Sequence, residues 1–189
     1  MEKSQVSVFG SSHCKSHHFP ENFNWHFWNS EKFFYPPANF SVGGKRITDG
    51  SVDFIIRKAR QIAPMKHYIV LNLGSNNIRN DHQYPEDLLP LFVEIAEELA
   101  LIPNVRLVLV SLVPSFARNE EFQNDFWRLG QHFRAMASLY PHVSWVNWVH
   151  QLFVNGQLHP GYFEDDVHLS DMGAVIFTNA IFNHISYLP

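Results

Sequence analysis

Two short runs of almost uninterrupted apolar residues constrain the fold of this chain more than any other feature. The runs are HYIVLNL at positions 67–73 and VRLVLVSL at positions 105–112. Each has the length of a β-strand and presents apolar side chains to both faces, so each face needs a covering layer. A parallel sheet between two layers of helices provides that environment. The runs therefore predict the central strands of an α/β protein.

Further strands and helices are expected around these central strands, from β-branched and aromatic clusters and from apolar residues spaced three and four apart. The expected strands are 5–9, 32–35 and 143–148. The expected helices are a short one directly after Ser12 and longer ones at 47–62, 85–102, 120–139 and 170–187. Thr48 or Asp49 is expected to cap the helix at 47–62, and Ser170 the last helix. Five strands alternating with helices predict a three-layer α/β/α fold with about five mostly parallel strands.

The length and charge of the chain limit the classes of protein to which it can belong. With 189 residues, 46% of them apolar, the chain suffices for one core and is short for two, so 1–189 is expected to form a single domain. It has 14 Lys and Arg residues against 18 Asp and Glu residues, a formal net charge of -4. That balance argues against nucleic-acid binding, because proteins that bind the phosphate backbone are usually basic.

The single cysteine and the absence of long apolar segments bear on where the protein works. Cys14 has no cysteine to pair with, so a reducing compartment and a buried structural thiol are expected, with a reactive thiol as the alternative. No apolar signal core precedes the first strand, and no run approaches the roughly 18 apolar residues that cross a bilayer. A cytoplasmic protein is expected. Because Met1 leads almost directly into the first strand, a domain excised from a longer protein is the alternative expectation.

The segment 19–40 is unusually rich in aromatic residues, with Pro, Asn and Ser between them. This mixture argues against a regular helix, and only the strand at 32–35 is expected before two prolines end it. One interpretation is a core strand between loops with packed aromatic rings. The other is an exposed apolar surface for lipid or a partner. The side chains considered for that surface are Phe23, Trp25, Phe27 and Trp28.

Three polar turns each follow a predicted strand, so all three fall at the same edge of the sheet. Ser12, Gly44 and Asn76 lie in these turns, each within a glycine-containing stretch. Since ligands bind at the carboxyl edge of open α/β sheets, we expect the three residues to converge on an active site there. The alternative for the first turn is that Ser11 or Ser12 merely caps a helix.

A serine becomes an effective nucleophile when a histidine, itself oriented by a carboxylate, takes its proton. The run EDDVHLS at 164–170 supplies both partners just before the last helix. Asp165 lies three residues before His168, close enough to accept a hydrogen bond from the imidazole. The alternative is a solvated acidic loop whose histidine caps the helix.

Attack on an ester carbonyl creates an oxyanion that needs preorganised donors. The backbone N–H groups of Ser12 and Gly44 and the side-chain amide of Asn76 are the expected donors. Asn77, Arg79 and His82 either line the pocket or have capping and surface roles. His13 and His17 have the spacing of two ligands on a helix, but no further ligand accompanies them, so no metal site is expected.

Taken together, these motifs resemble the four sequence blocks of the SGNH hydrolases, also called GDSL esterases and lipases. The blocks are Gly10-Ser11-Ser12, Gly43-Gly44, Gly74-Ser75-Asn76-Asn77 and the run at 165–170, in the family's order. The resemblance covers essentially the whole chain and implies a flavodoxin-like SGNH hydrolase fold without metal or organic cofactor. It implies that Ser12 is the nucleophile, His168 the base, Asp165 the orienting acid, and Gly44 and Asn76 oxyanion donors. Within the family, the chain most resembles platelet-activating-factor acetylhydrolases and the esterase domain of LINE-type retrotransposon first-open-reading-frame proteins.

One departure from the family pattern concerns Ser11, which stands where the family has aspartate in Gly-Asp-Ser. That aspartate usually supports the turn, and the Ser11 hydroxyl is expected to substitute for it. The function implied by the resemblance is a serine esterase for short-chain, acetyl esters of lipid-like alcohols. The alternatives are a catalytically weak or inactive fold that binds a membrane or a partner, and a carbohydrate acetylesterase. A homodimer is compatible with the sequence.

Overall fold

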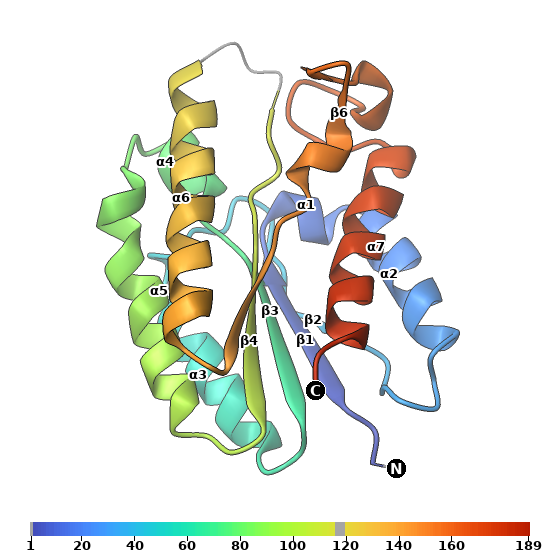
Figure 1. Cartoon of the computed structure of the whole chain (residues 1–189), viewed down its shortest axis with the longest axis vertical. Coiled ribbons are helices and arrows are strands. Elements are labelled where there is room, and N and C mark those ends of the chain that lie inside the picture. Colours follow the sequence, from blue (N-terminus) through green and yellow to red (C-terminus); the bar gives the residue numbers. More distant parts are fainter. Residues whose placement is uncertain (1, 116–119) are drawn as a thin grey trace.

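The computed structural model describes residues 2–115 and 120–189 and contains one five-stranded parallel sheet (Figure 1). The strand order is β2-β1-β3-β4-β5, so β1 and β3 lie next to each other near the middle. The strands are β1 (Gln5–Gly10), β2 (Ala38–Asn39), β3 (His67–Asn72), β4 (Val105–Val110) and β5 (Val143–Val146). All six residues of β3 are buried, as its continuous apolar run predicts.

Helices cover both faces of the sheet, which confirms the three-layer prediction (Figure 1). On one face Ile69 and Leu71 of β3 belong to a core shared with the first helical layer, and on the other face Val70 packs with the second. The first layer consists of α3 (Ser51–Ile62), α5 (Pro85–Ala100) and α6 (Glu120–Leu139). The second consists of α2 (His18–Trp28) and α7 (Asp171–Ser186).

Short elements lie beyond the carboxyl ends of the strands. Two of them, α1 and α4, begin just after β1 and β3, and the others precede α7. Their bounds are α1 (Ser12–Lys15), α4 (Ser75–Arg79), η1 (Val149–Leu152), β6 (Phe153–Val154), β7 (Gln157–Leu158) and η2 (Pro160–Tyr162). This edge therefore carries most of the irregular backbone, where side chains from several elements can converge.

The prediction that the segment 19–40 contains no regular helix is wrong, because α2 covers its first part. Phe19, Phe23 and Phe27 are spaced four residues apart and are all buried on one helix face. That face packs on the second layer, where Phe19 lies 5.3 Å from the ring of Phe177 in α7. Pro20 is tolerated because it lies in the first turn, where its missing N–H has no partner to lose.

The predicted strand at 32–35 is also wrong. Phe34 makes only an isolated parallel bridge with Ser4, and the edge strand β2 forms later, after the two prolines. There Ala38 pairs with Ser7 and Asn39 with Val8. A proline pair before an edge strand removes no ladder hydrogen bond, so the strand can follow it directly.

The remaining predicted elements differ from the structure mainly at their ends. The helix expected at 47–62 begins at Ser51, and Gly50, with a φ of 71°, occupies the cap position. Neither Thr48 nor Asp49 caps it; the Asp49 carboxylate accepts a hydrogen bond from the Arg46 backbone N–H instead. Ser170 does cap α7, accepting from the N–H of Gly173. None of the helices in the described ranges combines the length and apolarity needed to cross a membrane.

Candidate active site

The Ser12 turn is formed where β1 ends against a buried cysteine. A Cβ added to Gly10 would lie 2.7 Å from Cys14 Sγ, so only glycine fits beneath this thiol. Burial raises the pKa of the Cys14 thiol, and Cys14 is fully buried, which confirms the expected structural role. Ser11 takes the cap position of α1, and Ser12 begins the helix. The buried Ser11 Oγ makes no hydrogen bond to the described residues, so the prediction that this hydroxyl supports the turn is wrong. The close packing thus sets where Ser12 lies at the carboxyl end of β1.

The expected carboxylate–imidazole pair is present on the loop before α7. Asp165 Oδ2 lies 2.8 Å from His168 Nδ1, and Asp165 Oδ1 accepts from the backbone N–H groups of Val167 and His168 at 2.7 and 2.6 Å. Desolvation opposes ionisation of the Asp165 carboxyl, but the hydrogen bonds from His168 and Val167 outweigh it and lower its pKa to about 2. Asp165 is therefore a carboxylate at neutral pH, and it accepts the hydrogen bond that Nδ1 of His168 donates.

His13 connects the Ser12 turn to this loop. Its Nε2 lies 2.8 Å from the carbonyl oxygen of Val167, and its ring centroid lies 5.7 Å from that of His168. Burial lowers the pKa of His13 to about 4, so the ring is neutral and Nε2 must carry the hydrogen that it donates to the carbonyl. The residue after Ser12 is thus bonded to the residue before His168. Sequence reasoning considered His13 only as a metal ligand and missed this role.

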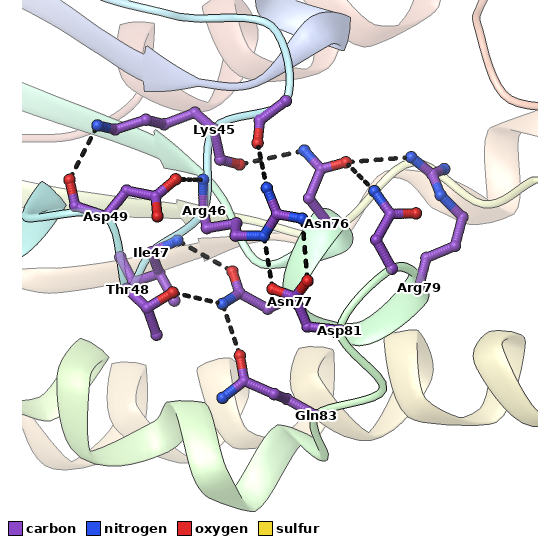
Figure 2. A network of polar contacts seen from close by, with 12 residues as sticks. Lys45, Arg46, Ile47, Thr48, Asp49, Asn76, Asn77, Arg79, Asp81 and Gln83 are labelled. Atoms are coloured by element: carbon purple, nitrogen blue, oxygen red, sulfur yellow. Dashed lines mark hydrogen bonds and ion pairs between the residues drawn. The ribbon is translucent and has the colours of Figure 1, made fainter.

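Asn76 meets the turn that contains Gly44 through a hydrogen bond to Lys45, the next residue (Figure 2). Asn76 is buried, and its Nδ2 donates to the carbonyl oxygen of Lys45 at 3.1 Å. Its Oδ1 accepts from Arg79 at 3.3 Å and from Asn80 at 3.1 Å. These contacts fix which end of the amide faces the Gly44 turn, and it is the donor end. Gly44 has a φ of +72°, a conformation that favours glycine.

An ion pair holds the Gly44 turn and the segment after α4 together (Figure 2). Arg46 donates to both carboxylate oxygens of Asp81, from Nε at 2.5 Å and from Nη2 at 2.9 Å, and its Nη1 donates to the carbonyl oxygen of Gly44 at 3.2 Å. The guanidinium of Arg46 holds the pKa of Asp81 below its usual range. A bidentate pair of this kind fixes orientation as well as distance. It therefore constrains the backbone of the Gly44 turn relative to α4.

Of the three residues whose role the sequence left open, Asn77 is structural. It is fully buried, its Oδ1 accepts from the N–H of Ile47, and its Nδ2 donates to Thr48 and Gln83, so its polar atoms are satisfied within the fold (Figure 2). His82 stacks on Phe122 at 5.9 Å. Arg79 is half-buried, and burial lowers its pKa while the charge of Asp165 opposes that shift. The charge of Arg79 therefore interacts with the carboxylate of the Asp165–His168 pair.

The structure brings some predicted site residues together and not others. Asp165 contacts His168, and Asn76 contacts the turn that contains Gly44. Within the described part of the chain, Ser12 Oγ forms no hydrogen bond, so its link to His168 runs through neighbouring residues. In structures without substrate such catalytic hydrogen bonds are often long. The roles assigned to these residues stay predictions.

The aromatic residues considered for a lipid or partner surface divide into two pairs. Phe23 and Phe27 are 1% and 2% exposed, so the prediction fails for them, because they belong to the core between α2 and α7. Trp25 and Trp28 are 62% and 59% exposed. Helical geometry explains the division, since a helix that buries every fourth residue turns those between them outward.

The histidines considered for a metal site do not form one in the described ranges. His13 is buried and bonded to Val167, whereas His17 is exposed and stacks on His18 with ring centroids 3.8 Å apart. Among the residues that the structure describes, no three His, Cys, Asp or Glu side chains are grouped as metal ligands.

Comparisons with known proteins find likeness in structure but not in sequence. No protein-family model matches the chain, and no curated protein does. A solved structure of a lipolytic G-D-S-L family protein from Veillonella parvula matches with a TM-score of 0.80 at 14% identity, over 98% of this chain and 100% of that one. A catalytic mutant of an acetylxylan esterase from Geobacillus stearothermophilus matches with a TM-score of 0.78 at 12% identity, over 100% and 97%.

A carbohydrate acetylesterase from Sinorhizobium meliloti is also similar, with a TM-score of 0.69 at 12% identity over 97% of this chain and 99% of that one. Structural likeness at such identities establishes the fold, while the resemblance to retrotransposon esterase domains stays a prediction. The near-complete coverage of both chains at these TM-scores shows that the likeness extends over the whole chain. The chain therefore has the fold of the SGNH, or GDSL-type, hydrolases.

Proposed function

We propose that this protein is an SGNH-type serine esterase, a carboxylic ester hydrolase that works without metal or organic cofactor. The observation that carries the proposal is the hydrogen-bonded connection between the Ser12 turn and the loop that contains His168. The Asp165–His168 pair is bonded through Val167 to His13, the neighbour of Ser12. Asn76 lies at the same edge of the sheet with its amide donor directed to the Gly44 turn. Nucleophile, base and oxyanion donors are thus supplied from separate loops at one edge.

The protonation state of His168 follows from its bond to Asp165. Because Asp165 is ionised, Nδ1 of His168 carries a hydrogen and donates a hydrogen bond to the carboxylate. In the neutral ring, Nε2 is then left with the free lone pair. This is the nitrogen that takes the proton of Ser12 when its hydroxyl attacks the ester carbonyl.

The remaining steps use the same groups. Attack by Ser12 Oγ forms a tetrahedral intermediate whose oxyanion accepts hydrogen bonds from the backbone N–H groups of Ser12 and Gly44 and from Asn76. The C–O bond to the alcohol breaks, and His168 returns its proton to the leaving oxygen. Water, deprotonated by His168, then attacks the acyl carbonyl, the bond to Ser12 Oγ breaks, and His168 returns the proton to Oγ as the acid leaves. Asp165 stabilises the imidazolium at each stage.

The substrates that we propose are short-chain acyl esters, with acetyl as the acyl group. The names of the acetylxylan esterase and the carbohydrate acetylesterase with similar structures support acetyl esters. The lipid-like alcohol expected from the sequence has only the exposed rings of Trp25 and Trp28, at the end of α2, to support it. These rings precede residues 33–35, which pair with Ser4 ahead of β1, so they lie near the amino edge of the sheet. Any lipid contact there docks the protein and does not line the Ser12 site.

The same exposed rings favour a second candidate function, a module that binds a membrane or a partner without turnover. Trp25, Trp28 and Phe33 are each at least half exposed, and large exposed aromatic groups mark interaction surfaces. Liposome binding that survives Ser12→Ala and disappears in a Trp25→Ala, Trp28→Ala double variant, with no ester turnover, favours this candidate.

Hydrolysis of 4-nitrophenyl acetate by wild type and variants tests the proposed esterase. Ser12→Ala and His168→Ala are each expected to lower kcat about a thousandfold or more. Ser11→Ala is the matched control, because the Ser11 hydroxyl is buried without a hydrogen-bond partner in the described part of the chain. Its loss is expected to leave turnover within about twofold and to leave stability unchanged or higher. Equal activity of wild type and Ser12→Ala contradicts the proposal.

A further inference from the structure

A groove that the proposed mechanism does not use opens between α6 and the η1–β6 segment. It has a volume of about 510 Å³, which lies within the size range of small-molecule sites. Its walls come from Ser111, just after β4, from Trp145 in β5, and from residues of α6 and of the β6–β7 turn. The groove therefore lies beyond the carboxyl ends of β4 and β5, at the same edge of the sheet as Ser12.

Four aromatic residues line the groove, and besides the buried Phe126 they are Trp127, Trp145 and Phe153. Trp145 is held in place because its Nε1 donates to Ser111 Oγ at 2.8 Å. Trp127 of α6 and Phe153 of β6 line the groove while remaining 65% and 43% exposed. Exposed rings from two elements, together with one fixed indole, can contact the faces of a ring-shaped ligand.

The polar groups in the groove are uncharged amides and an imidazole. Gln131, Asn147 and His150 line it, and their side chains form no hydrogen bond within the described ranges. No Asp, Glu, Lys or Arg is among the lining residues that the structure describes. Such a lining suits a neutral ligand with several hydroxyl groups. A hydrocarbon chain would remove water from the amides and would supply no hydrogen bonds in place of those that the amides make to water.

The distance between the groove and Ser12 sets what ligand can reach both. β1 and β4 are separated by β3, so their ends lie two strand spacings, or about 10 Å, apart. Ser12 lies just beyond β1, and Ser111 lies just beyond β4. A ligand acylated at Ser12 must therefore extend by more than one ring to occupy the groove.

We propose that this groove binds an uncharged sugar ring of an oligosaccharide whose acyl ester, on a neighbouring ring, is presented to Ser12. The proposal rests on the esterase function and names the alcohol part of its substrate. Trp127 and Phe153 contact the sugar faces, and Gln131 and Asn147 hydrogen-bond its hydroxyl groups. Binding energy from this remote ring serves to position the ester.

Calorimetric titration of the purified protein with unacylated xylotetraose, cellotetraose and chitotetraose tests the groove without any catalysis. Wild type is expected to bind at least one of them, and Trp127→Ala to bind it about tenfold more weakly. Trp25→Ala is the matched control, because Trp25 is 62% exposed on a helix at the other end of the molecule, and it is expected to bind like wild type. Equal weakening in both variants, or no binding of any tetrasaccharide by wild type at millimolar concentration, overturns the proposal.

Two further measurements separate this site from the esterase activity and from a lipid site. Hydrolysis of 4-nitrophenyl acetate, which is too small to reach the groove, is expected to be unchanged in Trp127→Ala. If wild type does not hydrolyse this ester but still binds the sugar, the esterase function is refuted and the sugar-binding site is supported. Binding of 1-decanol in place of the sugars, abolished by Trp127→Ala, identifies an acyl-chain site and refutes the proposal.

Discussion

Arg79 is a single residue whose hydrogen bond acts on Asn76, the side chain that we propose as an oxyanion donor. It donates to Asn76 Oδ1 at 3.3 Å, which helps to keep Nδ2 directed to the Gly44 turn. Its charge also acts on Asp165 and His13. Arg79 is therefore a positioning residue, held half-buried beside groups that must keep a fixed orientation.

Replacing Arg79 by methionine is expected to lower kcat for 4-nitrophenyl acetate about tenfold and to leave KM within about twofold, because the amide matters most in the transition state. Arg79→Lys restores the charge without the planar geometry and is expected to recover only part of kcat. Arg134→Met, at an exposed position on α6, is the control and should behave like wild type. A rise in KM with unchanged kcat would show that Arg79 binds substrate and does not position Asn76.

The residues that we propose to act directly could be named from the sequence, whereas those that we infer to position them could not. Ser12, Asn76 and His168 each stand in a turn after a strand or before a helix, so their residue types and places sufficed. His13 and Arg46 act through contacts with Val167 and Asp81, which lie 154 and 35 positions away in the chain. Nothing in the local pattern indicates such distant partners.

The loop with Asp165 and His168 comes directly before α7, and a glycine in the first turn of α7 lets the helix approach the backbone near Tyr162. A Cβ added to Gly173 would lie 2.1 Å from the carbonyl oxygen of Tyr162. The same loop is bonded to the helix start by Ser170, whose N–H donates to Tyr162 O at 2.9 Å and whose Oγ donates to Gly161 O at 2.8 Å. The position of His168 thus depends on close packing of backbone against backbone.

Gly173→Ala is expected to lower the free energy of unfolding by about 2 kcal/mol or more, because a backbone carbonyl must move to accept the methyl group. Gly130→Ala on α6 is the matched control. There the nearest atom to an added Cβ is Ser111 Oγ at 3.4 Å, and alanine favours a helix over glycine by about 1 kcal/mol, so stability should be equal or higher. Urea denaturation of the three proteins gives the comparison, and equal stability of Gly173→Ala and wild type contradicts this account of the loop.

At the scale of elements, long periodic or continuously apolar segments were predictable and short ones were not. The helix expected at 120–139 matches Glu120–Leu139, because its apolar spacing extends over five turns. The helix α2 was missed because local composition, with Pro20 and several Asn residues, outweighed the four-residue spacing of three buried Phe side chains. Helices of four or five residues, such as α1 and α4, are too short to show any periodicity.

Two buried histidines make the whole fold sensitive to mild acid. Desolvation lowers the pKa of both His13 and His67 to about 4, and His67 bonds to the buried Ser7 hydroxyl at 2.7 Å. In the unfolded chain these rings titrate near the ordinary value of 6.5. Between about pH 6.5 and pH 4 the unfolded state therefore binds more protons, so the free energy of unfolding falls as the pH falls through this window.

Each ring is expected to reduce the free energy of unfolding by about 2 kcal/mol between pH 7 and pH 5. His67→Gln removes one of them, so its loss of stability between these two pH values should be smaller than that of wild type by about this amount. His150→Gln, at an exposed position, should show the wild-type loss. Urea denaturation at the two pH values measures both, and an unchanged loss in His67→Gln would refute the assignment.

The central claim is that Ser12 is a nucleophile activated by His168, and covalent labelling tests it most directly. The protein is treated with a fluorophosphonate at neutral pH and digested, and the labelled peptide is sequenced by mass spectrometry, with Ser11 and Ser16 as internal controls on either side. The account predicts one adduct, on Ser12, that forms at least a hundredfold more slowly in His168→Ala. Labelling of Ser11 or Ser16, equal labelling with and without His168, or no adduct at all would contradict it.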